Sequence, residues 1–118
     1  MKYLAVDYMY RSGSNWKTFA TIYFKMENED NKEQLIEKIE TILGEHFIAR
    51  QVDFPEIFDW TGDPLDDHCY HEVRSVYTVD FLKGELHPLN AEAFIERYQD
   101  IKWEWFNPLD ISEGVEVA

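Results

Sequence analysis

The side chains best suited to chemistry lie close together in residues 66–73, DDHCYHEV. Asp67, His68, Cys69 and His71 are the candidates there for binding a metal ion. Zinc sites need nitrogen and sulfur donors in a tetrahedral set, which is commonly supplied as two spaced pairs. The segment has no C-x-x-C or H-E-x-x-H spacing, and a second pair would have to come from a distant histidine. A metal site is therefore an alternative reading, and no cofactor is predicted.

A thiol enzyme is the other chemical reading of the same segment. Cys69 and His71 would point the same way on a strand, but a nucleophilic pair also needs an orienting group and an oxyanion hole, and the sequence locates neither. On the core side of a strand, His71 is instead a partly buried core histidine and Cys69 a small hydrophobic residue. We predict no catalytic residues, and keep a metal- or thiol-dependent enzyme around His68, Cys69 and His71 as an alternative.

Alternating runs predict the strands that would position these residues. Residues 3–11 and 16–25 alternate between apolar and polar side chains, and the glycine-containing loop 12–15 joins them, which is typical of a β-hairpin. A third strand is predicted from about Cys69. Its core side would comprise Cys69, His71, Val73, Ser75, Tyr77, Val79 and Phe81.

Helical periodicity predicts two helices. The first covers residues 32–43, with Asp30 as its N-cap and Gly44 as the residue that ends it. The second follows Asn90 as N-cap. Between them, residues 47–52 are predicted as a short strand, followed by a brief helix from Pro55. Residues 102–106 are predicted as a final strand or as a continuation of the second helix.

Together these elements predict one α+β domain over residues 1–106: a small antiparallel sheet, made of the N-terminal hairpin and the strand from Cys69, with two helices packed on one face. The 118 residues suit a single domain, and 45% hydrophobic residues argue against disorder. Residues 107–118 are predicted to form a flexible tail. The sequence lacks a membrane span and a signal peptide, and its lone cysteine agrees with a reducing compartment, so we expect a cytoplasmic protein.

The net charge of −13 is unevenly distributed. Residues 1–26 are net positive, whereas residues 27–45, 53–67 and 85–118 are all strongly acidic. Direct binding to nucleic acid or to an anionic membrane is disfavoured, because both require a cationic footprint. A basic protein is the expected partner, although the same charge would also serve solubility alone.

Four acids fall in a row on the first predicted helix. Asp30, Glu33, Glu37 and Glu40 repeat at steps of three, four and three residues, which places neighbours about 6 Å apart along the helix. The row suggests a non-enzymatic protein-binding module. An alternative is an acidic nucleic-acid mimic of phage or mobile-element origin that inhibits a DNA- or RNA-binding defence protein. An ordinary solvated helix face would show the same pattern.

The predicted partner contact extends beyond this helix. It includes the acidic loop with Asp63 and Asp66, and Trp60 and Trp103 as possible anchors, since tryptophan is enriched among interface hot spots. The alternative for Trp103 is that it covers the core.

Three segments carry a resemblance to known sequences: YRSGSNWKTF at 10–19, FIARQVDFPEIF at 47–58 and DDHCYHEV at 66–73. They resemble those of a family of small bacterial proteins without an assigned activity. The resemblance implies a bacterial or mobile-element origin and assigns no catalytic residues.

Overall fold

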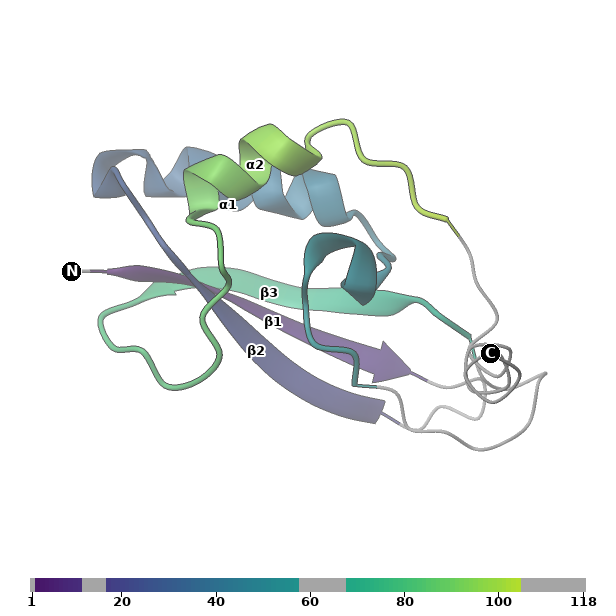
Figure 1. Cartoon of the computed structure of the whole chain (residues 1–118). Coiled ribbons are helices and arrows are strands. Elements are labelled where there is room, and N and C mark those ends of the chain that lie inside the picture. The colour runs from purple at the N-terminus through teal and green to yellow at the C-terminus, as the bar shows by residue number, and fades with distance from the viewer. Residues whose placement is uncertain (1, 12–16, 58–67, 105–118) are drawn as a thin grey trace.

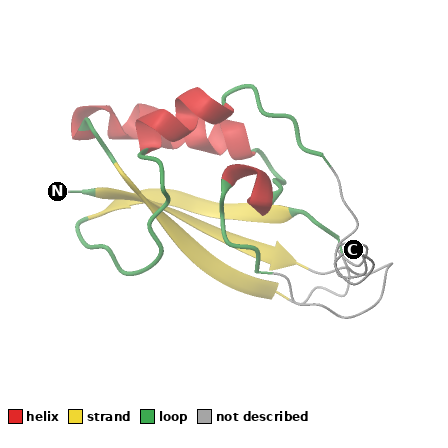
Figure 2. Cartoon of the chain, in the orientation of Figure 1, coloured by secondary structure: helices red, strands yellow, loops and turns green. Residues whose placement is uncertain are grey.

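The computed structural model describes residues 2–11, 17–57 and 68–104. Within these ranges the chain forms three strands, two α-helices and two short 3-10 turns (Figures 1 and 2). In chain order they are β1 Tyr3–Arg11, β2 Lys17–Lys25, the 3-10 turn Glu29–Asn31, α1 Lys32–Leu43, the 3-10 turn Ala49–Val52, β3 His71–Val79 and α2 Ala91–Tyr98. No helix in the described ranges is long and apolar enough to cross a membrane.

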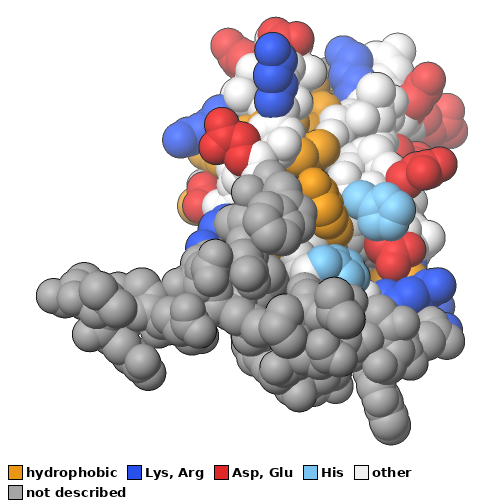
Figure 3. Space-filling view, turned by 90° about the vertical axis from the view of Figure 1, so that its right-hand side faces the viewer, with side chains coloured by type: hydrophobic (Ala, Val, Ile, Leu, Met, Phe, Trp, Pro, Cys, Tyr) orange, Lys and Arg blue, Asp and Glu red, His pale blue; other side chains and the backbone are white. Residues whose placement is uncertain are grey.

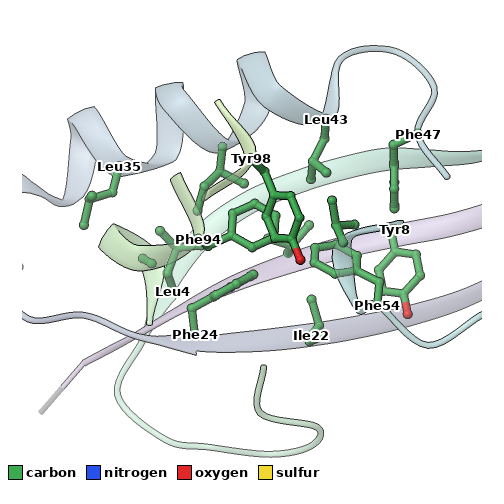
Figure 4. Packing of buried hydrophobic residues seen from close by; sticks show 14 of the residues in the cluster. Leu4, Tyr8, Ile22, Phe24, Leu35, Leu43, Phe47, Phe54, Phe94 and Tyr98 are labelled. Carbon is green, nitrogen blue, oxygen red and sulfur yellow. The ribbon is translucent and has the colours of Figure 1, made fainter. Parts of the chain in front are cut away.

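The sheet is antiparallel with strand order β2-β1-β3, and both helices lie on one of its faces (Figure 1). The predicted α+β architecture is therefore confirmed. The core lies between the sheet and the helices, where Leu4 and Tyr8 of β1 and Ile22 and Phe24 of β2 belong to one buried cluster with Phe94 of α2 (Figure 4). Aromatic rings dominate this layer: the Phe24 and Phe94 centroids lie 4.9 Å apart in an edge-to-face arrangement.

A β-bulge interrupts the pairing of β3 with β1. Asp7 is paired with Ser75 but Tyr8 with Val73, so that Arg74 is an extra residue on β3. A residue inserted in this way reverses which side chains face the core beyond it.

The bulge overturns the predicted alternation of β3. His71 and Val73 face the helices as expected, but beyond the bulge Val76 packs against the core instead. Ser75, Tyr77 and Val79 pair with residues on the opposite face of β1, and Phe81 is 72% exposed. The prediction that these four residues share the core side with His71 was wrong, because periodicity alone does not reveal an inserted residue.

Helix α1 matches its predicted range but not its predicted start. Leu35, Ile39 and Leu43 are buried, and Gly44 ends the helix at φ 62°, a conformation that glycine adopts without strain. Asp30 is not the N-cap: it lies in the preceding 3-10 turn, where its backbone N–H donates to the side chain of Asn28. This short turn shifts the start of the helix beyond Asp30.

Residues 45–57 differ from the predicted strand and helix. Phe47 forms only an isolated bridge with His71, exchanging both backbone hydrogen bonds at 2.9 and 2.7 Å, and the chain then enters the 3-10 turn Ala49–Val52. No helix begins at Pro55, since residues 54–57 have no regular structure. The segment instead inserts Phe54 into the core, where its ring lies 5.3 Å from that of Tyr8 (Figure 4).

Helix α2 begins as predicted. The Asn90 side chain accepts a hydrogen bond from the backbone N–H of Ala93 at 2.8 Å, which satisfies one free donor of the first turn. Glu92 in that turn accepts hydrogen bonds from the backbone N–H groups of Glu27 and Asn28 and so ties α2 to the segment before α1. Residues 102–104 form neither the predicted strand nor a continuation of α2, and residues 105–106 of that predicted segment lie outside the described residues. Predictions for the loop 12–15 and for the tail 107–118 lie outside the described residues.

The two asparagines that precede the helices provide a matched pair of variants. Asn90→Ala should lower the free energy of unfolding by about 1 kcal/mol, because it removes a side-chain cap. Asn31 precedes α1 without making a side-chain cap hydrogen bond, so Asn31→Ala should change stability by less than about 0.5 kcal/mol. Urea denaturation followed by circular dichroism measures both. Equal losses would show that the Asn90 cap does not stabilise α2.

Candidate functional site

His71 lies at the centre of an aromatic cluster. Its side chain is fully buried, with the rings of Tyr8, Tyr10 and Phe47 at centroid distances of 6.0, 5.4 and 5.9 Å. The backbone N–H of Ile57 donates to His71 Nε2 at 3.2 Å, so that this nitrogen carries no proton. Burial lowers the pKa of His71 from 6.5 to about 4, outweighing a hydrogen bond to the Cys69 backbone. The imidazole is therefore neutral at pH 7.

The neighbouring side chains also hold backbone segments together. His68 accepts a hydrogen bond from the Tyr70 N–H at Nδ1, and its Nε2 contacts the Arg11 carbonyl at the end of β1. The Tyr10 hydroxyl accepts from the His68 N–H at 3.1 Å. Cys69 is fully buried. In the part of the chain that the structure describes, no three His, Cys, Asp or Glu side chains gather as a metal site, and Asp67 lies outside that part.

A shallow hollow on this end of the molecule is lined by His46, His68 and Tyr70. The space-filling view shows histidine side chains at the surface here (Figure 3). The Tyr70 ring lies near both imidazoles, with its centroid 6.2 Å from that of His46 and 6.3 Å from that of His68. Both ring nitrogens of His68 are already engaged with backbone groups, so His68 offers no free ring nitrogen to this hollow.

The predicted acidic row lies on α1. Glu33, Glu37 and Glu40 are all exposed on the side of α1 opposite its buried residues. The ion pairs found among the described residues join Arg11 to Glu72 and Arg50 to Glu56, and neither involves this row. Hereafter these three residues are called the acidic face of α1.

A furrow beside the acidic face was not predicted. It runs between α1 and α2, and its wider end is a hollow of about 360 Å³. Two residues of α2 line it, Ile95 and Gln99, and five residues of α1: Gln34, Glu37, Lys38, Thr41 and Ile42. The two isoleucines are half-buried at the margin of their helices' apolar faces. Each isoleucine continues the apolar face of its own helix, and the relative placement of the two helices leaves both partly exposed.

The tryptophan candidates are only partly within the described residues. Trp103 is half-buried against the core, with its ring 6.2 Å from that of Phe47, so it covers the core and retains some exposed surface. Trp60, Asp63 and Asp66 lie outside the described residues.

A further polar cluster, also unpredicted, lies on the sheet face away from the helices. The Asp7 carboxylate on β1 accepts hydrogen bonds from Thr21 of β2 at 2.6 Å and from Ser75 and Tyr77 of β3 at 3.2 and 3.0 Å. Burial and the nearby carboxylate raise the pKa of Tyr77. The cluster links all three strands, and it could not be found from sequence because it depends on their register.

Comparison with known proteins identifies no relative: no family model, curated protein or solved structure matches this chain. The resemblance to a bacterial family therefore stays a prediction, and any function must be argued from the geometry.

The low pKa of His71 predicts an acid-sensitive fold. The unfolded chain binds a proton near pH 6.5 and the folded chain only near pH 4, so that stability is complete above pH 6.5 and falls as the pH approaches 4. This gap corresponds to about 3 kcal/mol. His71→Phe should flatten the slope of unfolding free energy against pH in that interval, as measured by urea denaturation.

The exposed His46 provides the control for this experiment. His46→Gln should leave the slope as in the wild type, because the side chain lies at the surface. His87 is also buried and has a lowered pKa, so part of the slope should persist in His71→Phe. If the slope of unfolding free energy against pH were the same in His71→Phe as in the wild type, the folded state would not lower the pKa of His71.

Proposed function

We propose that this chain is a non-enzymatic, protein-binding module and that the acidic face of α1 contacts a basic protein partner. The proposal is supported chiefly by the exposure of Glu33, Glu37 and Glu40 in one row without ion pairs among the described residues. Such carboxylates keep their charge available to a partner. Complementary charge guides association and determines which partners are accepted.

The geometry around His68, Cys69 and His71 supports a binding role over an enzymatic one. Both ring nitrogens of His68 and Nε2 of His71 are engaged with backbone groups, and Cys69 is withdrawn from the surface. A nucleophile or metal ligand must reach a substrate or an ion. In this arrangement the three residues stabilise the end of the sheet.

The alternative function, an acidic mimic of nucleic acid, would be a special case of the proposed protein-binding module. Three of the four acids of the predicted row lie on α1, and Asp30 precedes it in the 3-10 turn. The helix also carries Lys32 and Lys38, which interrupt a continuous negative surface. We therefore propose a basic protein in general as the partner, in the cytoplasm of a bacterium.

Charge reversal on α1 tests the proposal. Glu33→Lys, Glu37→Lys and Glu40→Lys should be combined in one variant and used to capture proteins from a bacterial lysate. Proteins held by the wild type and released by salt should be lost, because exposed ion pairs contribute about 0.2–1 kcal/mol each and reversal adds repulsion. Quantitative mass spectrometry of the eluates measures the loss.

A control variant with the same net charge separates local from global charge effects. Asp80→Lys, Glu85→Lys and Glu104→Lys change three exposed acids that lie outside α1 and α2. This variant should retain the proteins that the α1 variant loses. Equal retention by both variants, or equal loss from both, would contradict a specific contact through α1.

A further inference from the structure

The furrow between α1 and α2 is continuous along most of α1. Its wider hollow shares Gln34, Lys38 and Ile95 with a second hollow that reaches Asn31 and Glu92. Asn31 and Ile42 are eleven positions apart, which corresponds to roughly 16 Å or three helical turns. The furrow is therefore long enough for a helical segment of a partner.

The chemistry of the furrow is apolar along its floor and acidic along its margins. Ile42 and Ile95 provide half-buried apolar surface. On the α1 side Glu37, one of the three residues of the acidic face, lines the furrow, and on the α2 side Glu96 is exposed next to Ile95. Glu92 is already engaged by two backbone N–H groups. An occupant must accordingly combine an apolar stripe with basic side chains on either side.

The backbone of the occupant is constrained as well. In the middle turns of α1 the backbone N–H and C=O groups bond within the helix, so this side of the furrow offers few partners to an extended peptide, whose own backbone groups would lie unpaired over apolar side chains. A helix satisfies its backbone internally and can place side chains at i and i+4 into a groove between two others.

We propose that the furrow binds an amphipathic, basic α-helix of the partner protein. This inference rests on the proposed function and specifies the partner element: apolar residues would contact Ile42 and Ile95, and lysine or arginine would pair with the acidic face. Lys38 is the basic residue among those that line the furrow, so it lowers the affinity for such a helix.

A defined pair of synthetic peptides tests the proposal with the full chain. One is a capped 14-residue peptide with leucines at i and i+4 positions along one face and lysines elsewhere; the other has the same composition with the leucines dispersed. Fluorescence anisotropy should show binding of the first alone. Methyl NMR spectra should show shifts at Ile42 and Ile95 on its addition.

Two variants assign the binding to the furrow. Ile95→Asp should weaken binding of the peptide about tenfold or more, because a charged side chain replaces an apolar one in the floor of the furrow. A cooperative thermal unfolding transition shows that this variant is folded. Lys38→Glu alters an exposed side chain without touching the floor, and it should strengthen binding. An unaltered affinity in both variants would overturn the furrow as the site, as would equal binding of the two peptides.

The outcomes for the furrow and for the proposed function can be distinguished. In one outcome, the charge-reversed α1 variant fails to capture the proteins that the wild type captures from lysate, while Ile95→Asp and Lys38→Glu still capture them. In that case the acidic face remains the contact and the furrow proposal fails. If the lysate partners are unaffected by reversal of the α1 face, the proposed function fails, whatever the peptides show.

Discussion

The structure depends on the burial of β1 between two strands and beneath two helices. From Leu4 to Tyr10, every β1 side chain except that of Asp7 is buried. A middle strand of this kind is hydrogen-bonded on both edges, so both neighbours must form for it to be stable. Asp7 fits this position because hydroxyl groups from β2 and β3 donate to its carboxylate. The hydrogen bonds of Asp7 thus link the same three strands that the apolar core holds together.

Local patterns were sufficient to predict much of this fold. The hairpin, the range of α1 and the Asn90 cap each follow from side chains a few residues apart. The bulge at Arg74 and the Phe47 bridge to His71 could not be predicted in this way, because each depends on a strand distant in the sequence. The same reason applies to the segment before α1, whose backbone is held by Glu92 from α2.

In the candidate site, too, only the features that depend on local sequence patterns were predicted. The burial of His71 and Cys69 was predicted from their positions on a strand, and the exposed row on α1 from helical periodicity. The furrow was not predicted, because Ile42 and Ile95 come from different helices and each is typical of a core position in its own sequence context. A groove between two elements is a property of their packing and leaves no local pattern.

The two faces of the molecule are chemically distinct, and this difference leads to a direct test. The sheet face has its central carboxylate satisfied within the fold, whereas the helical face combines acids that form no ion pair with another described residue and a furrow that contains Ile42 and Ile95. Hydrogen–deuterium exchange of the chain, with and without a partner captured from lysate, locates the contact. The account predicts slower exchange in α1 and α2 and unchanged exchange in β2 and β3 on binding. Protection confined to β2 and β3, with the helices unchanged, would contradict it.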